Sequence, residues 1–233
     1  MNDMVFIGWD VGGWHGQKNS LAVIDIKGQL VEGSPTTIDN IRDEEAFIEM
    51  INHFPKFVLG IDSPLRFPKA FKDLLNDSYK GSIDKNCKMI NNPLAYRYTD
   101  KKIHQVFKKH PLSASFDKLG NPATVAMYYI NKFKEQLECS ILPFDTKSEN
   151  RNVIEVYPAI LESDVFFKQE EILNSYEEMK DNYITGDEKE ITSDERDAIK
   201  AAFIALAVYK NGFKTYADAG KDLSEGWIYY VAK

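Results

Sequence analysis

Carboxylates recur at the ends of apolar segments in this chain. Asp10 in IGWDVGG, Asp62 in LGIDSPL and Glu155 in VIEVYP each follow apolar residues and precede a glycine or proline by at most three positions. A further segment, SDERDAIKAAFIALA, carries Asp194 and Asp197 ahead of an apolar run. If the first three segments are neighbouring strands of one sheet, their acids meet near one another. An all-oxygen set of ligands of this kind suits Mg²⁺ or Mn²⁺.

Asp194 and Asp197 fall in a predicted helix over residues 192–210. Helical spacing places both acids on the same face as a stripe of small and apolar residues, Ala201, Ile204 and Val208. Acids in a first turn also stabilise the helix dipole, and Thr192 with Glu195 forms a capping-box pattern. That alternative explains Glu195 well and Asp194 adequately. It explains Asp197 less well, because Asp197 lies deeper in the helix and faces inward.

A cluster of four carboxylates needs compensation. Two like charges about 4 Å apart repel by roughly 4 kcal/mol at an effective dielectric constant of 20, and a whole domain is stable by only about 5–15 kcal/mol. We therefore expect Asp10, Asp62 and Asp197 to hold one or two divalent cations, with Glu155 and Asp194 as further ligands. Two such ions about 3.5–4 Å apart support in-line attack of water on a phosphodiester. The pattern thus predicts a metal-dependent nuclease.

The elements that must position these acids follow from hydrophobic spacing. Residues 4–11, 20–26 and 29–33 are predicted strands, residues 42–54 have the apolar spacing of a helix, and residues 56–62 form a buried strand. Residues 122–137, 168–182 and 192–210 are predicted helices, residues 150–158 a further strand, and residues 225–231 a terminal extended segment. We expect one α/β domain over residues 1–233, with a mixed sheet in β-β-β-α-β order flanked by helices.

Residues 64–121 are predicted to be an insertion over the sheet, mainly helical or irregular, with a helical stretch near residues 100–109. From Arg66 to Lys118 the chain carries twelve Lys and Arg against five Asp and Glu, although the net charge of the whole chain is −7. The positive balance predicts contact with nucleic acid, and a solvated surface is the equal alternative. Arg97, Tyr98 and Lys101 are the candidate substrate-binding residues. Arg97 suits either a phosphate or a local carboxylate, and Tyr98 either stacks on a base or packs internally.

Six motifs resemble those of a known family. IGWDVGG, GIDSPL, YRYTD, VIEVYP, DERDAIKAA and EGWIYY occur in the order seen in domain-of-unknown-function family 429, described as predicted ribonuclease H-like nucleases. DERDA also resembles the last helix of the Holliday-junction resolvases in that superfamily. The resemblance implies a ribonuclease H-like fold in which Asp10 is the first-strand metal ligand, Asp62 follows the fourth strand, and Asp194 and Asp197 are the last-helix pair. Resolvase-like sites carry Glu after that strand, so Glu155 either supplies the missing reach or belongs to another pocket.

Two other functions stay open. Actin-like and sugar-kinase phosphotransferases also begin with an Asp followed by a glycine hairpin, and DVGG is compatible with it, but IDSPLRF supplies no second glycine-rich phosphate loop. A non-catalytic nucleic-acid or protein binding member of the fold is the other alternative. Hydrophobic residues make up 43% of the chain and we identify no membrane segment. Two cysteines far apart in the sequence favour reduced thiols and a cytoplasmic location.

Overall fold

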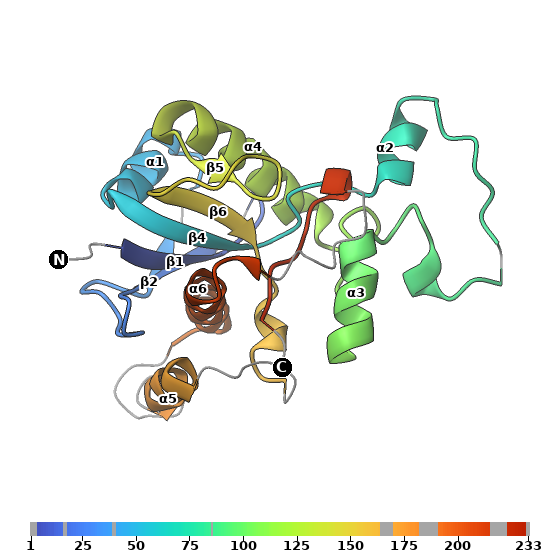
Figure 1. Ribbon diagram of the computed structural model, residues 1–233. Helices are drawn as coiled ribbons and strands as arrows, with labels where there is room; N and C mark the ends of the chain where they lie inside the picture. The colour runs from blue at the N-terminus through green and yellow to red at the C-terminus, as the bar shows by residue number, and fades with distance from the viewer. Residues whose placement is uncertain are drawn as a thin grey trace.

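The computed structural model describes residues 4–15, 18–38, 41–84, 86–163, 170–181, 191–214 and 223–231. Its centre is a mixed six-stranded sheet in the order β3-β2-β1-β4-β6-β5 (Figure 1). The strands are β1 (Met4–Asp10), β2 (Asn19–Ile24), β3 (Thr36–Ile38), β4 (Lys56–Asp62), β5 (Ser140–Ile141) and β6 (Arg151–Glu155). β2 runs antiparallel to β1 and β3, whereas β1, β4, β6 and β5 run parallel. The predicted α/β class and the β-β-β-α-β start of the chain are confirmed.

The third strand begins later than predicted. Residues 29–33 make only a single antiparallel bridge, between Ile24 and Leu30, and β3 follows at Thr36–Ile38. The reason is the turn chemistry of this segment: Gly28 and Gly33 both adopt positive φ, so the backbone turns at each end of the short apolar run. The prediction of a strand over residues 29–33 was wrong.

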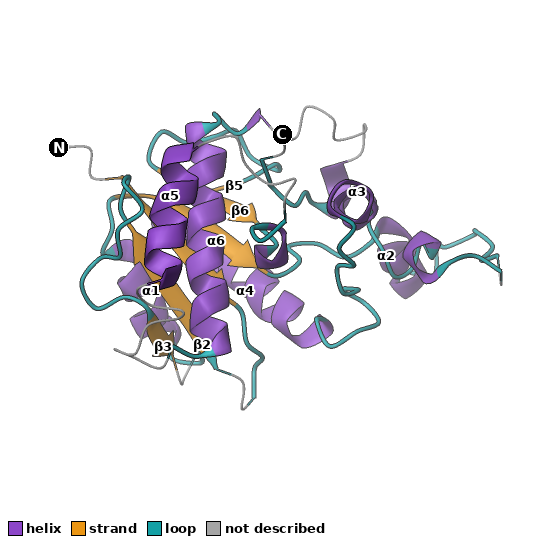
Figure 2. Cartoon of the chain, turned by 90° about the horizontal axis from the view of Figure 1, so that it is seen from below, coloured by secondary structure: helices purple, strands orange, loops and turns teal. Residues whose placement is uncertain are grey.

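Two helical layers cover the two faces of the sheet (Figure 1). One face packs against α1 (Glu44–Asn52) and α4 (Gly120–Leu137), and the other against α6 (Ser193–Lys210), with α5 (Glu170–Met179) beside α6 (Figure 2). Residues 168, 169 and 182 of the predicted charged helix lie outside the described residues. The helix α6 begins as predicted, with the Thr192–Glu195 capping box formed. Alternate residues of β1 and β4 therefore point into different cores.

The insertion projects from one end of the sheet (Figures 1 and 2). It contains α2 (Lys69–Leu75), a 3₁₀ turn at Met89–Asn91 and α3 (Tyr98–Phe107). The C-terminal segment ties it to the body: a 3₁₀ turn at Leu223–Glu225 is followed by extended backbone, and Tyr229 N–H donates to the Glu155 carbonyl. Within the described ranges, no helix combines the length and apolar character needed to cross a membrane.

Candidate active site

Asp10 and Asp62 lie side by side at the carboxyl ends of two parallel strands. They are the last residues of β1 and β4, and the register pairs them directly. Adjacent strands are about 4.8 Å apart, and paired residues project to the same face of a sheet. The structure therefore brings these two predicted site residues together on the face that α6 covers.

The helix α6 rests directly on the backbone of β1 and β4. A Cβ atom built on Gly8 would lie 1.9 Å from the carbonyl oxygen of Ala198 and 2.4 Å from the nitrogen of Ala202. A Cβ on Gly60 would lie 2.8 Å from the carbonyl oxygen of Ala201. Gly8 and Gly60 are themselves register partners. These two glycines set how closely α6 approaches and fix its position along the strands.

That contact fixes where the acids of the helix lie. Asp194 is one helical turn before Ala198, and Asp197 is one turn before Ala201. The strand-end carboxylates follow the two glycines by two residues, on the same face of the sheet. The first turn of α6 therefore lies over the ends of β1 and β4, and four carboxylates from three elements face a common space.

The closeness of these carboxylates affects their pKa values. Burial, reinforced by the charges of Asp194 and Asp197, raises the pKa of Asp10 to about 7. The pKa of Asp62 rises well above its ordinary value, chiefly through burial and then through the charges of Asp10 and Asp197, with a smaller contribution from Glu155. Asp10 and Asp62 thus lie in a poorly solvated space beside the charges of the helix acids, which favours protonation or a bound cation. The side chain of Asp197 is itself 43% exposed, so it faces inward less than the sequence predicted.

Lys200 is a member of this site that the sequence analysis missed. Its Nζ lies 3.1 Å from Asp197 Oδ1 and 3.1 Å from Glu162 Oε1, and its side chain is only 14% exposed. Its charge opposes the rise in the pKa of Asp62. The sequence feature that could have identified Lys200 is its position three residues after Asp197, on the same side of the helix. Lys200 supplies one positive charge against four carboxylates, so the site stays net negative.

Ser20 is a second residue that was missed. It is the register partner of Asp10 on β2, it is fully buried, and its Oγ has no hydrogen-bond partner among the described residues. The next strand continues the row with Thr37, whose hydroxyl donates to Glu195 Oε1 at 3.3 Å. A polar row therefore crosses β4, β1, β2 and β3 beneath the start of α6.

Glu155 does not join the carboxylates of this site. It pairs in register with Ile61, one residue before Asp62, so its side chain projects to the opposite face of the sheet. Both of its oxygens are occupied: Arg97 donates to Oε1 at 2.5 Å and to Oε2 at 2.8 Å, and Leu65 N–H donates to Oε2 at 3.0 Å. The prediction of Glu155 as a metal ligand does not fit this arrangement.

Arg97 serves the fold rather than an exposed phosphate. It is 1% exposed, and its guanidinium bonds both carboxylate oxygens of Asp100, at 2.7 and 3.1 Å, as well as those of Glu155. We name these three residues the buried triad. The hydrogen bonds of the triad use the guanidinium donors of Arg97. The prediction that Arg97 binds a substrate phosphate therefore does not fit, and the alternative that it bonds a local carboxylate matches the structure. Burial raises the pKa of Glu155, against the charge of Arg97.

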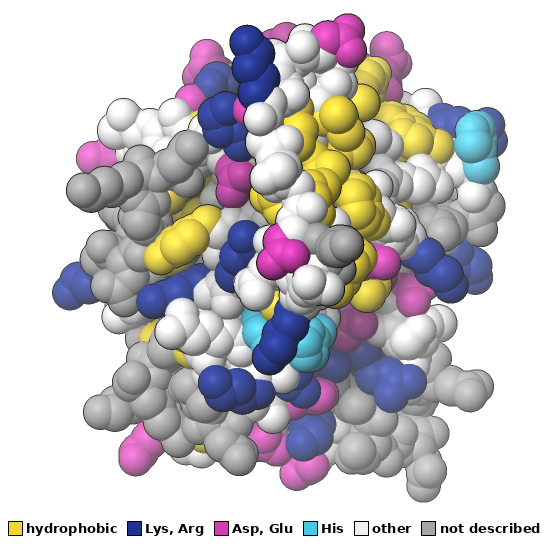
Figure 3. All heavy atoms as spheres, turned by 90° about the vertical axis from the view of Figure 1, so that its right-hand side faces the viewer, with side chains coloured by type: hydrophobic (Ala, Val, Ile, Leu, Met, Phe, Trp, Pro, Cys, Tyr) yellow, Lys and Arg dark blue, Asp and Glu magenta, His cyan; other side chains and the backbone are white. Residues whose placement is uncertain are grey.

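Tyr98 and Lys101 remain at the surface of the insertion. Tyr98 is 43% exposed, and its ring stacks on Trp227 with centroids 6.4 Å apart. Both residues line an open depression of about 290 Å³ that also contains the acidic residues Asp73 and Glu225. Figure 3, which faces this end of the molecule, shows Lys and Arg interspersed with acidic side chains and a hydrophobic band rather than a continuous basic patch.

The carboxylate oxygens of the four clustered acids suit a hard cation, but their side chains do not surround a common point. Among the described residues, no three His, Cys, Asp or Glu side chains are placed as they stand to hold a metal ion together. Binding would require the side chains of Asp10, Asp62 and Asp197 to rotate toward one point, which mutual repulsion opposes without a cation. The chemistry of the ligands therefore fits Mg²⁺ or Mn²⁺, with side-chain rearrangement as a condition.

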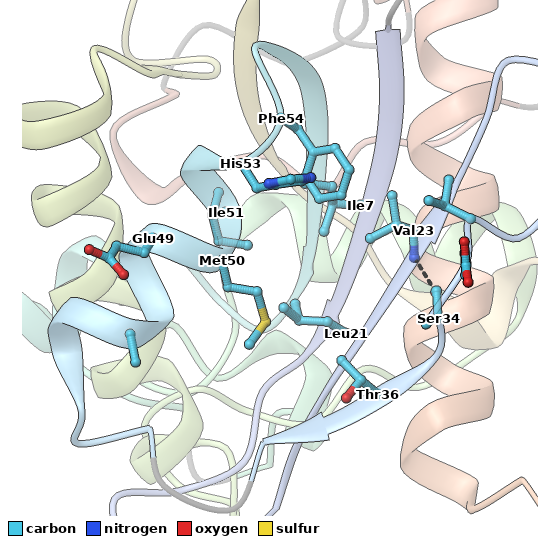
Figure 4. Close-up of a pocket in the computed structure, with 14 residues that line it drawn as sticks. Ile7, Leu21, Val23, Ser34, Thr36, Glu49, Met50, Ile51, His53 and Phe54 are labelled. Carbon is cyan, nitrogen blue, oxygen red and sulfur yellow. Dashed lines mark hydrogen bonds between the residues drawn. The ribbon is translucent and has the colours of Figure 1, made fainter.

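A larger cavity lies away from these acids. It encloses about 460 Å³ between α1 and the strands β2 and β3, and Figure 4 shows Leu21, Val23 and Met50 along its largely apolar wall. None of the four clustered carboxylates lines it.

Comparisons of this chain with family models, with curated proteins and with solved structures found no match.

Proposed function

We propose that this chain is a metal-dependent nuclease with a ribonuclease H-like fold. The observation that carries the proposal is the convergence of Asp10 and Asp62 with Asp194 and Asp197 of α6, together with the rise of the Asp10 pKa to about 7. The sheet order, with three strands in hairpin order before a helix and a parallel fourth strand beside the first, agrees with the resemblance to domain-of-unknown-function family 429.

In this proposal Asp10, Asp62 and Asp197 hold one or two Mg²⁺ or Mn²⁺ ions. A bound cation of this kind would polarise the phosphate and make a water molecule more acidic. Hydrolysis forms a bond from the water oxygen to phosphorus and breaks one bond from phosphorus to a sugar oxygen, which takes up a proton. Lys200, which contacts Asp197, holds that carboxylate in place, and Asp194 sits at the edge of the site.

The insertion supplies the contact with nucleic acid. Tyr98 and Lys101 line the open depression at this end of the molecule, where an exposed ring and an ammonium group suit a base and a phosphate. The basic balance of the insertion supports this role. Its scattered acidic side chains predict modest affinity with a shallow dependence on salt. A cytoplasmic location belongs to the same proposal.

The test is hydrolysis of single-stranded, duplex and branched substrates with Mn²⁺ or Mg²⁺. Wild-type protein should cleave at least one of them, and chelation should abolish the activity. Asp10→Asn and Asp197→Asn should each remove the activity while leaving the fold intact. Asp145→Asn, outside the cluster, is the matched control and should retain it. Equal activity in the cluster variants would show that these carboxylates do not perform the reaction.

A further inference from the structure

A small cavity opens on the other side of Asp62 from Asp10. It encloses about 180 Å³ between the ends of β4 and β6, the insertion and the start of α4. Most of its wall is apolar, formed by Pro64, Pro111, Leu112, Leu119, Val156 and Ile228. Asp62 and Ser63 form part of its polar wall, so the cavity adjoins the carboxylate site directly.

The remaining polar wall is Tyr157, whose hydroxyl donates to the His110 carbonyl at 3.4 Å, and the buried triad, which has little to offer a charged ligand. The Arg97 donors are bonded to Asp100 and Glu155, whose four carboxylate oxygens all receive hydrogen bonds from Arg97. One guanidinium facing two carboxylates, with Asp62 close by, leaves the polar wall net negative. A phosphate or carboxylate group would be repelled from this cavity.

Ser63 is the polar group that a ligand could satisfy. It is 3% exposed, it lines the cavity, and its Oγ has no hydrogen-bond partner among the described residues. Burying a hydroxyl without a partner costs about 1–3 kcal/mol, so a group that supplies the hydrogen bond would be favoured there.

Size and chemistry together define the occupant. At about 180 Å³, the cavity has room for one planar base. The ligand must be uncharged, have largely apolar faces and carry a hydrogen-bonding edge for Ser63. We propose that this cavity holds a single unpaired base of the strand whose phosphate lies at Asp10 and Asp62.

This inference rests on the proposed nuclease function and specifies its substrate. A base seated among protein side chains cannot remain paired, so the enzyme acts on single-stranded nucleic acid or on a nucleotide extruded from a duplex. A polyhydroxy sugar would find few polar partners beside the six apolar residues of the wall.

Two measurements test the cavity, and the first does not depend on catalysis. It is titration of metal-free protein with thymidine, uridine and adenosine, which carry no phosphate, followed by NMR. The second is Mn²⁺-dependent cleavage of oligonucleotides in which single nucleotides are replaced by abasic residues. The variants are Leu112→Trp, which fills the cavity from a half-exposed position, and Ser63→Ala. Leu173→Trp on α5 is the control for added surface tryptophan.

Wild-type protein should bind at least one of these nucleosides, and Leu112→Trp should weaken that binding by about tenfold or more, a typical loss for one base contact. An abasic residue at one position should slow cleavage by a similar factor. Cleavage that ignores base removal, with no nucleoside bound, would overturn the cavity assignment and leave the nuclease standing. Nucleoside binding that Leu112→Trp removes, without hydrolysis of any substrate, would retain the base pocket and refute the nuclease.

Discussion

Replacing Asp10 by asparagine should stabilise the metal-free protein at alkaline pH. The folded state raises the pKa of Asp10 from 3.8 to about 7, through burial and the charges of Asp194 and Asp197. The folded protein therefore binds this proton more tightly than the unfolded chain does. The associated stability is complete below about pH 4 and is lost as the pH rises to about 7. An asparagine keeps the shape of the side chain and never ionises.

The magnitude follows from the same two values. A difference between 3.8 and about 7 corresponds to ~4 kcal/mol at full ionisation, which is an upper limit because the clustered acids share their protons. Above pH 8 we expect Asp10→Asn to raise the free energy of unfolding of the metal-free protein by about 2–4 kcal/mol. At pH 4 the two proteins should differ by less than about 1 kcal/mol, because Asp10 is then neutral in the folded state and only about half ionised in the unfolded state.

The assay is urea unfolding in a chelator at half-unit steps from pH 4 to pH 9, followed by tryptophan fluorescence. Trp9 is fully buried beside Asp10 and reports on this part of the core. A parallel series with Mn²⁺ should narrow the difference between the two proteins. Wild type should gain about 2.7 kcal/mol at a cation concentration one hundred times its Kd, and the variant less.

The matched control is Asp145→Asn, which should act in the opposite direction. Burial raises the pKa of Asp145, but its ion pair with Lys134 and the Ile141 N–H bring the net pKa below the ordinary value. Its loss should destabilise the protein by about 0.5–1.5 kcal/mol at neutral pH. If Asp10→Asn destabilises the metal-free protein at pH 8, or leaves the pH profile unchanged, the reasoning about mutual repulsion is wrong.

Three further outcomes follow from the packing. Arg97→Met should lower the free energy of unfolding by about 3–5 kcal/mol in urea titrations, because two buried carboxylates lose their cation. Gly8→Ala should lower the free energy of unfolding by about 1–3 kcal/mol or more, because its Cβ overlaps the backbone of α6. Gly120→Ala, where a Cβ meets nothing closer than 3.5 Å, should be nearly neutral in the same urea titrations. Glu225→Ala should cost about 1 kcal/mol and speed hydrogen exchange at the first turns of α2 and α3, since its carboxylate accepts from a backbone N–H of each; unchanged exchange there would contradict this capping role.

Local pattern in the sequence was enough to predict much of the framework. The apolar runs ending in Asp10 and Asp62 predicted strands where β1 and β4 lie, and the capping box with an apolar stripe predicted the helix that carries Asp197. These features depend on side-chain periodicity and on groups a few residues apart, so neighbouring residues decide them. The insertion was located by its glycine and proline residues and by its charge, but α2 was not predicted; it is seven residues long and buries none of them.

Which acids meet depends on how distant strands align in the sheet. Asp62 and Glu155 follow nearly identical apolar patterns, yet the register aligns Asp62 with Asp10 and aligns Glu155 with Ile61. That offset of one residue turns the two side chains to opposite faces of the sheet, toward α6 in one case and toward Arg97 in the other. Strand register depends on packing against distant elements, here the contact of α6 with Gly8, and no spacing within a single segment encodes it. Residue types and local spacing therefore identify the side chains that could do the chemistry, and the alignment of the strands selects those that share one site.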